Sequence, residues 1–177
     1  MNSSIMSFCI YGFGSTGKSA AKYLKSKNFQ NVKIWDDKKK TKTGKKFFLK
    51  YLDSCDYIIL SPGINLKKSK LKNKLLRNKH KIITDLDLFY LFNPKIKTIV
   101  ITGTNGKSTT CKILEHVLRK NDTNVRLAGN IGKPILDLNL KNSPIVIIEA
   151  SSFQLAHSKY VKPTYAAILN ITKDHLD

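Results

Sequence analysis

KTIVITGTNGKSTTCKILEHVL, residues Lys97 to Leu118, changes character near its middle. Its first part, Thr98 to Thr102, consists only of β-branched residues, which is typical of a strand buried on both faces. From Cys111 onward the apolar residues fall at helical spacing: Cys111, Ile113, Leu114, Val117 and Leu118. The stretch therefore predicts a strand, a glycine-containing turn and a helix.

The predicted turn contains Gly103, Thr104, Asn105, Gly106, Lys107, Ser108 and Thr109. Its glycines let main-chain N–H groups approach phosphate oxygens, and the start of the helix adds partial positive charge. Lys107 would reach the β- and γ-phosphates of a nucleotide, and the Ser108 hydroxyl would bind magnesium. The first glycine of the standard phosphate loop is replaced by Ile101, so this is a shortened variant. The alternative is a glycine-rich turn followed by a chance Lys-Ser pair.

Length and composition limit the classes of protein. The 177 residues suffice for one ordinary domain or two small ones, and a hydrophobic content of 41% predicts a packed core. The formal net charge of +20 would suggest a polyanionic partner, but only Arg77, Arg119 and Arg126 are arginines. The lysines are spread along the chain, as in a general compositional bias. We therefore expect no nucleic-acid partner.

Cysteine spacing and hydropathy indicate the compartment. Cys9, Cys55 and Cys111 are widely separated, which favours neither a disulfide framework nor a zinc site. The N-terminus lacks the pattern of a signal peptide, and no stretch approaches the ~20 apolar residues of a membrane span. We expect a soluble, cytoplasmic protein with no membrane partner.

The N-terminal region carries a second glycine turn. Ser7 to Tyr11 predicts a strand, which leads into the G-x-G-x-x-G sequence from Gly12 to Gly17 and then a helix. A second strand, Val32 to Trp35, ends at Asp36, about 20 residues after the last glycine. This βαβ arrangement predicts a nucleotide site with Asp36 near the sugar or base. The alternative is a Rossmann-like fold whose first turn holds no ligand.

The remaining elements of the first half are less specific. The lysine-rich residues 38 to 46 predict a solvated loop, and Asp56 to Leu60 a strand that ends in the turn Ser61-Pro62-Gly63. Further predictions are a helix from Leu66 to Lys79 with Leu71, Leu75 and Leu76 facing inward, a strand from Lys81 to Thr84, and a helix from Asp85 to Phe92 capped by Asp85. Asn93-Pro94 predicts a domain boundary near residues 93 to 96.

The second half adds a candidate metal ligand. Pro144 to Glu149 predicts an apolar strand that ends in one carboxylate, and magnesium prefers oxygen ligands. The alternative is that Glu149 is only a charge at the start of a helix. Val125 to Ala128 and Tyr165 to Leu169 predict two more strands, and the second of these leads to His175. A histidine alone is more often a surface residue than a ligand.

Six motifs then define a resemblance: GFGSTGKS, SPGI, ITGTNGKST, GNIGKP, EASSFQL and NITKDHLD. In this order the chain resembles the Mur ligases of peptidoglycan synthesis, and within them the group that adds D-glutamate to UDP-N-acetylmuramoyl-L-alanine. The resemblance implies an α/β fold. Residues 1–93 would form a Rossmann-like domain that binds the UDP substrate, and residues 94–177 the first part of a phosphate-loop central ATPase domain.

The resemblance also implies roles for individual residues. The cofactors would be ATP and Mg²⁺. Lys107 and His175 would be catalytic, Ser108 and Glu149 would hold one magnesium, and His175 a second. Asn130 would line the path of the muramoyl peptide, and the UDP part would lie against Ser15, Thr16, Asp36 and Gly63. Lys38 stands where the family usually has an arginine. The family's D-glutamate-binding C-terminal domain and its carbamylated lysine would lie beyond Asp177, which implies a missing C-terminal half and an inactive isolated chain.

Three alternatives remain open at this point. The GTNGKST loop is shared with folylpolyglutamate synthases, so the chain could be another member of the wider superfamily. A nicotinamide-dependent oxidoreductase built on residues 1–93 would leave Glu149 and His175 unexplained. A non-catalytic nucleotide-binding fragment, or one half of a split enzyme, is the third.

Overall fold

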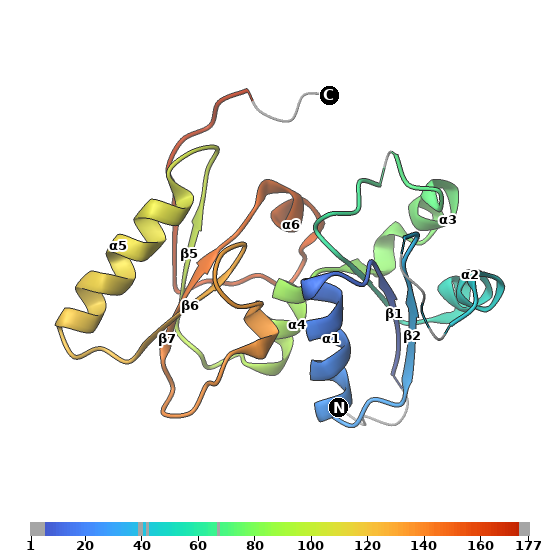
Figure 1. The fold of residues 1–177 in the computed structure, drawn as a ribbon, viewed down its shortest axis with the longest axis horizontal. Helices are drawn as coiled ribbons and strands as arrows, with labels where there is room; N and C mark the ends of the chain where they lie inside the picture. The colour runs from blue at the N-terminus through green and yellow to red at the C-terminus, as the bar shows by residue number, and fades with distance from the viewer. Residues whose placement is uncertain (1–5, 39–40, 42, 67, 174–177) are drawn as a thin grey trace. The chain divides into compact units, whose positions relative to one another are not determined.

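The computed structural model describes residues 6–38, 41, 43–66 and 68–173. The chain divides into two compact units, each with one four-stranded parallel sheet (Figure 1). The first unit extends to Leu88 and includes His157–Lys159, and the second comprises Phe89–Ala156 and continues from Tyr160. The predicted α/β class is confirmed. Among the described helices, none has the combination of length and apolarity that a membrane span needs.

The first unit alternates strands and helices. Its strands are β1 (Ser7–Tyr11), β2 (Asn31–Trp35), β3 (Tyr57–Leu60) and β4 (Ile82–Ile83). Its helices are α1 (Ser15–Ser26), α2 (Lys45–Ser54), α3 (Lys72–Arg77), the 3-10 turn η1 (Lys79–Lys81) and the start of α4 (Asp85–Phe92).

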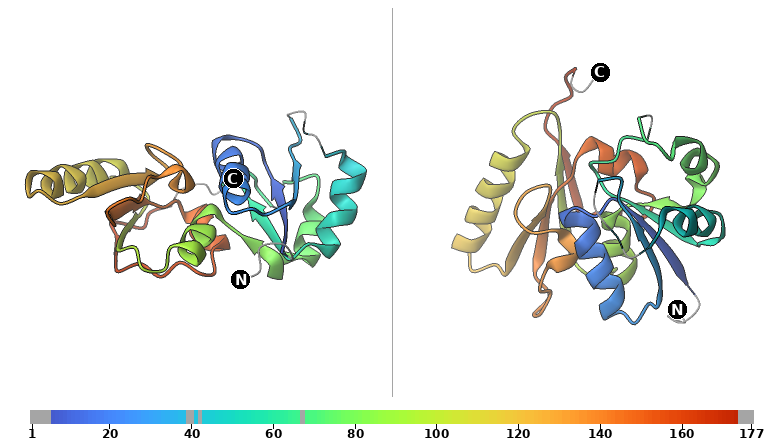
Figure 2. Two further views of the ribbon diagram at one scale, coloured as in Figure 1. Left: turned by 90° about the horizontal axis from the view of Figure 1, so that it is seen from below. Right: turned by 45° about the vertical axis from the view of Figure 1, so that its right-hand side comes forward.

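The strand order β2-β1-β3-β4 places β1 at the centre of this sheet. Phe8 pairs with Val32 on one side and with Tyr57 on the other. From β1 the chain passes to β2 at one edge of the sheet, and from there it crosses over β1 to form β3 on the other side. Right-handed crossovers in opposite directions put α1 on one face and α2 on the other, as Figures 1 and 2 show. The turns after β1 and β3 therefore meet where the strand order reverses, which is where open α/β sheets bind ligands.

Helix α2 was not predicted, and it begins inside the predicted loop of residues 38 to 46. Phe48 and Leu52 lie one turn apart on α2 and are fully buried against Cys9 and Tyr11 of β1. The lysines around this stretch are solvated and hide the short apolar stripe in the sequence.

Helix α3 is shorter than predicted, Lys72–Arg77 instead of Leu66 to Lys79. The Asn65 side chain accepts the N–H of Lys68 (3.3 Å) and the Ser69 hydroxyl accepts the N–H of Leu71 (3.0 Å), so polar side chains hold this segment in turns. Leu71 and Leu75 are buried as predicted. The prediction that Leu76 faces inward was wrong, because Leu76 is 48% exposed.

The cap of α4 also differs from the prediction. The helix begins at Asp85, and the residue before it, Thr84, is the cap. Asp87 accepts the Thr84 main-chain N–H (2.8 Å), while the Thr84 hydroxyl accepts the Asp87 N–H (3.4 Å). This reciprocal pair is a capping box with aspartate in the acidic position.

The second unit contains β5 (Thr98–Thr102), α5 (Lys107–Lys120), β6 (Val125–Gly129), the 3-10 turn η2 (Ile135–Asp137), β7 (Ile145–Glu149), α6 (Ser152–His157) and β8 (Tyr165–Ile168). The strand order is β6-β7-β5-β8. All eight predicted strands of the two units are present, each within one residue of its predicted ends.

Helix α5 packs on the sheet of the second unit (Figure 1). Cys111 is fully buried against Ile101 and Ile147, which belong to β5 and β7. Ile113 and Val117 also fall on the predicted helical spacing, but they are 59% and 48% exposed. The loop that joins β5 to α5 is thus fixed at both ends to the buried strands.

Candidate active site

The loop between β5 and α5 has the backbone that a phosphate loop requires. Gly103 has a φ of 144° and Gly106 a φ of 79°, conformations that favour glycine. Gly106 is the N-cap of α5 and leaves the first turn of the helix without a side-chain cap. Thr110 donates to the Gly106 carbonyl (2.9 Å). The N–H groups of Lys107, Ser108 and Thr109 therefore have no acceptor within the helix and form an anion-binding N-terminus.

Lys107 lies against the loop that it follows. Its ammonium donates to the carbonyl oxygens of Gly103 (2.6 Å) and Thr104 (2.7 Å). The side chain is half-buried, so the charge is held beside the N-terminus of α5. The predicted phosphate-binding lysine is thus positioned on the loop itself.

Ser108 and Glu149 are brought together although they are far apart in the sequence. The Ser108 hydroxyl donates to Oε2 of Glu149 at 2.8 Å. Glu149 is the last residue of β7 and is 3% exposed. Burial, and next the nearby charge of Glu149, raise the pKa of the Cys111 thiol to about 11. A buried carboxylate therefore lies directly beside the first turn of α5.

Asn130 lies at the same edge of this sheet. Its main-chain N–H donates to the carbonyl of Glu149 (2.9 Å), and Asn130 is exposed to solvent. Gly129, with a φ of 111°, precedes it, and an added Cβ there would lie 2.2 Å from the Glu149 carbonyl oxygen. The glycine thus permits the close approach that keeps Asn130 next to Glu149.

One residue of the loop region was not singled out from the sequence. Asn170, just after β8, accepts the main-chain N–H groups of Thr104 (3.1 Å) and Asn105 (2.9 Å) with its side-chain oxygen. Its amide nitrogen donates to the Asn105 carbonyl (3.0 Å). In the sequence Asn170 ends an apolar strand and begins the NITKDHLD motif, but neither feature gave it a role of its own. His175, the remaining predicted metal ligand, lies outside the described residues.

The first unit has its own glycine turn, after β1. An added Cβ on Gly17 would lie 2.0 Å from the Gly12 carbonyl oxygen, and one on Gly12 would lie 2.7 Å from Cβ of Ser61. The Ser61 hydroxyl donates to the Gly12 carbonyl (2.9 Å), which ties the turn after β3 to this loop. Gly14, in contrast, has open space where its Cβ would be. Two glycines therefore serve packing, and the third leaves room for a ligand.

The predicted UDP-contacting residues lie around this turn. Ser15 and Thr16 begin α1, where Ser15 is exposed and Thr16 half-buried. Gly63 follows Ser61 and is exposed. The residues after β3 thus form a turn beside the glycine loop, as the sequence predicts for a ligand crevice.

Asp36 holds the glycine turn from the side of β2. Its two carboxylate oxygens accept the N–H groups of Phe13 (2.6 Å) and Lys38 (2.8 Å). Asp37 accepts the Tyr11 hydroxyl (2.6 Å), and burial, with this hydrogen bond second, raises the pKa of Tyr11 to about 12. A cavity of about 400 Å³ is lined by Trp35, Asp36, Asp37, Lys38, Thr41, Thr43 and Gly44.

Comparison with known proteins identifies the same regions. Residues 101–177 match the family described as the Mur ligase middle domain. The chain is 38% identical to the UDP-N-acetylmuramoylalanine--D-glutamate ligase of Rickettsia prowazekii (strain Madrid E), with 95% of this chain and 39% of that protein covered. It is also 38% identical to the enzyme of the same name from Aquifex aeolicus (strain VF5), with 97% of this chain and 40% of that protein covered.

A solved structure supports the fold. The UDP-N-acetylmuramate:L-alanyl-gamma-D-glutamyl-meso-diaminopimelate ligase from Neisseria meningitides has a TM-score of 0.54 at 18% identity, with 98% of this chain and 63% of that chain covered. This similarity concerns the fold alone. The chain spans about 40% of the length of the curated relatives that it matches. By its motifs, its fold and these relatives, the chain belongs to the Mur ligase family.

Proposed function

We propose that this chain is the nucleotide-binding part of a UDP-N-acetylmuramoyl-L-alanine:D-glutamate ligase, an ATP-dependent enzyme of peptidoglycan synthesis. Residues 1–93 would bind the UDP substrate, and residues 94–177 would belong to the central ATPase domain. The partner would be a C-terminal half that binds D-glutamate. We assign this activity to the cytoplasm, because Cys9, Cys55 and Cys111 are buried thiols and fit a reducing compartment.

The observation that carries the proposal is the contact between Ser108 and Glu149. The Ser108 hydroxyl and Oε2 of Glu149 are 2.8 Å apart. This hydrogen-bonded pair lies at the N-terminus of α5, where phosphates bind, and would hold a magnesium ion there. Both atoms are hard oxygen donors, which fits this cation.

The proposal gives roles to the start of α5, to Lys107 and to the candidate metal ligands. The N–H groups at the start of α5 would hold phosphate oxygens, and Lys107 would exchange its loop carbonyls for the β- and γ-phosphates. Ser108 and Glu149 would hold the magnesium, and His175 a second one. When bound, magnesium neutralises the charge that develops on the phosphates during transfer.

The proposed reaction has two steps. The alanyl carboxylate oxygen attacks the γ-phosphorus of ATP, the bond to the bridging oxygen breaks, and ADP leaves. The amine of D-glutamate then attacks the acyl carbon, inorganic phosphate leaves, and the amine loses a proton to give the amide. In the first step Lys107 would stabilise the negative charge on the transferred phosphoryl group, since such catalysis depends mainly on positioning and electrostatics.

The features of the first unit support a nucleotide-linked substrate there. Gly14 leaves open space at the start of α1, a helix of 12 residues, and Ser15 presents an exposed hydroxyl. A diphosphate would meet the N-terminus of this helix. The cavity beside Asp36 lies next to the turn that Asp36 holds, and would receive the uridine or its ribose.

Calorimetry on the 177-residue chain tests the proposal. The parent should bind Mg-ATP and UDP, and NADH more weakly than UDP. Glu149→Gln should weaken Mg-ATP binding roughly 10- to 100-fold, the range for disturbed metal sites. ATP binding without magnesium should change little, because the variant removes a metal ligand and no phosphate contact. Glu115→Gln is the matched control, since Glu115 lies on α5 and forms an ion pair with Arg119 one turn further along the helix.

Two results would contradict the proposal. Tighter binding of NADH than of UDP would favour an oxidoreductase for the first unit. Equal effects of Glu149→Gln and Glu115→Gln on Mg-ATP affinity would remove Glu149 from the metal site.

A further inference from the structure

Asn170 lies at the carboxyl end of β8, opposite the phosphate loop. In the register of this sheet, Thr102 pairs with Ile168, so the segments that follow β5 and β8 leave the sheet side by side. The Leu169 N–H donates to the Thr102 carbonyl (2.9 Å), which continues the pairing up to Asn170. The loop thus has β8 as its neighbour on one side.

The Asn170 side chain uses both ends of its amide on this loop. Oδ1 accepts the N–H groups of Thr104 (3.1 Å) and Asn105 (2.9 Å), and Nδ2 donates to the Asn105 carbonyl (3.0 Å). An aspartate could accept the two N–H groups but could not donate, and an aliphatic side chain could do neither. Only a primary amide of this length satisfies all three groups at once.

The main chain around Asn170 adds to this connection. Its carbonyl also accepts the Thr104 N–H (3.1 Å), and a Cβ on Gly103 would lie 3.2 Å from its N and O atoms. Two residues further, the Thr104 hydroxyl donates to the Thr172 carbonyl (3.3 Å) and accepts the Thr172 N–H (3.1 Å). The first half of the loop is thus held to the segment after β8.

These contacts decide which N–H groups remain for an anion. The N–H groups of Thr104 and Asn105 are directed at Asn170, so phosphate is left with those at the start of α5. The Thr104 carbonyl, which accepts the Lys107 ammonium, belongs to the same held segment. The orientation of the loop therefore depends on a residue that need not touch the nucleotide.

We propose that Asn170 is a positioning residue for the phosphate loop, which it holds in the conformation that binds Mg-ATP. The inference rests on the proposed function, because it presumes that the loop binds a nucleotide. Without the amide, Thr104 and Asn105 lose the acceptor that fixes their main chain. Part of the free energy of Mg-ATP binding would then be spent on ordering the loop.

The test combines calorimetry with amide hydrogen exchange by NMR on the 177-residue chain. In Asn170→Ala the Kd for Mg-ATP should rise at least tenfold, and the amides of Thr104 and Asn105 should lose protection. The later amides of α5, from Leu114 to Leu118, should stay protected. The control is Asn139→Ala, because Asn139 is exposed and its side chain accepts the N–H of the nearby Lys141. The Kd of this variant for Mg-ATP should stay within twofold of the parent's.

The outcomes distinguish the proposed function from the positioning role of Asn170. If the parent itself fails to bind Mg-ATP, the proposed function fails. If the parent binds and Asn170→Ala binds equally well, the function stands and the positioning role is overturned. Loss of protection throughout α5 would also overturn it, since Asn170 would then be needed for the unit to fold. If Asn170→Ala does not fold, Asn170→Asp replaces it. This variant should keep the protection of Thr104 and raise the Kd at least threefold, and a parent-like Kd would overturn the role.

Discussion

At the scale of single residues, the ammonium of Lys107 is held by two carbonyl oxygens of its own loop. Hydrogen bonds to a charged group contribute more than neutral ones, so these contacts keep the loop closed around the lysine. Phosphate binding would replace carbonyl dipoles by full negative charges at nearly the same place. The lysine therefore needs only a small movement to change partners, and this favours a loop that is organised before the nucleotide binds.

Replacement of Lys107 should weaken the binding of nucleotide phosphates. Lys107→Ala should weaken Mg-ATP binding by roughly 1.5–3 kcal/mol, the value of a charge-assisted hydrogen bond. In a thermal-shift experiment, Mg-ATP should stabilise the parent and have little effect on the variant. Lys112→Ala is the matched control, because Lys112 is an exposed lysine on the same helix. An equal nucleotide response in Lys107→Ala and in the parent would exclude Lys107 from the phosphate site.

The residues of the loop differ in how far they could be predicted. Lys107 and Ser108 follow a glycine turn directly, so local spacing indicates their chemistry. Glu149 could be proposed because a carboxylate ends an apolar strand. Asn170 could not, since its partners are fixed by the pairing of β5 with β8, 65 residues along the chain from Asn105. The sequence shows the asparagine, but it does not show that the asparagine lies next to the phosphate loop in the folded chain.

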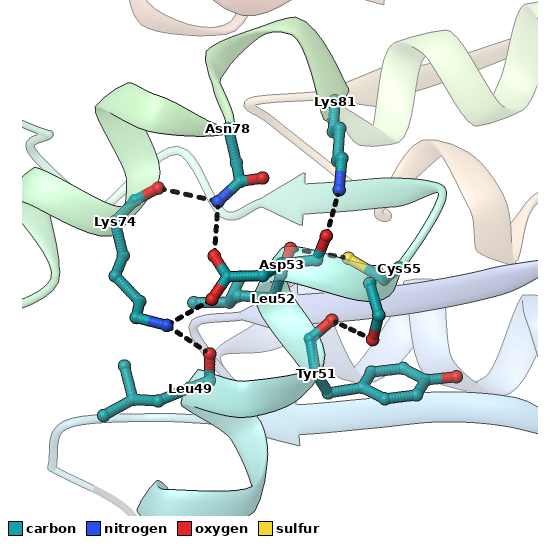
Figure 3. A network of polar contacts seen from close by, with 9 residues as sticks. Leu49, Tyr51, Leu52, Asp53, Cys55, Lys74, Asn78 and Lys81 are labelled. Carbon is teal, nitrogen blue, oxygen red and sulfur yellow. Dashed lines mark hydrogen bonds and ion pairs between the residues drawn. The ribbon is translucent and has the colours of Figure 1, made fainter.

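At the scale of elements, Asp53 connects three segments of the first unit. Figure 3 shows Asp53 at the end of α2 in contact with Lys74 and Asn78, which belong to α3 and follow it. Lys74 also donates to the Leu49 carbonyl (2.9 Å), and Lys81 to the Asp53 carbonyl (2.7 Å). The hydrogen bond from Lys74, and next that from Asn78, lower the pKa of the Asp53 carboxyl below its ordinary 3.8.

This network predicts a pH-dependent loss of stability in Asp53→Asn. A carboxyl whose pKa is lower in the folded state stabilises the fold above its unfolded pKa, and this contribution is lost as the pH falls through the folded value. At pH 7 the free energy of unfolding of the variant should be about 0.2–1 kcal/mol lower than that of the parent. The effect is small because the ion pair is half-exposed. The difference should therefore begin to shrink as the pH falls below about 3.8 and vanish below the lower pKa of the folded state.

Urea unfolding monitored at pH 7 and pH 3 measures this difference. Asp137→Asn, at an exposed position of the second unit, is the control and should behave as the parent at both values. A difference between parent and Asp53→Asn that persists undiminished at pH 3 would show that the ionised carboxylate is not the cause.

The elements that could be predicted are those with a strong apolar pattern. Buried parallel strands such as β7 are continuous apolar runs, and they stand out against a lysine-rich background. Helix α2 does not, because its buried positions, Phe48 and Leu52, are separated by an exposed lysine and two half-buried residues, Leu49 and Tyr51. For α3 the error was the reverse: polar side chains of the turn before it compete for main-chain groups, and propensity alone does not reveal this competition.

At the scale of the whole molecule, β8 differs from the other strands. It pairs with β5 on one side, and all four of its residues are exposed, among them Tyr165 at 68% and Ile168 at 65%. Ile171, just after it, is 85% exposed. Parallel sheets are normally covered on both faces. Since the curated relatives are about two and a half times as long, we expect further polypeptide to cover this strand in the active enzyme.

The last prediction follows from this incomplete cover: the 177-residue chain alone should not release phosphate in the presence of ATP, UDP-N-acetylmuramoyl-L-alanine and D-glutamate. Phosphoryl transfer needs its groups positioned and shielded from water, and orientation alone can supply about 7–11 kcal/mol of barrier reduction. Lys107, Ser108 and Glu149 are in place, and the proposal assigns the site for the amine to a C-terminal half.

The measurement is release of inorganic phosphate that depends on both UDP-N-acetylmuramoyl-L-alanine and D-glutamate, with a full-length relative as positive control. Binding of Mg-ATP without turnover is the expected result, because the proposal places the phosphate loop in this chain and the amine site in a C-terminal half. Turnover at the rate of the full-length relative would contradict the prediction. Activity that appears only when the C-terminal part of a relative is added would support it, since that part would then supply both the cover of β8 and the site for D-glutamate.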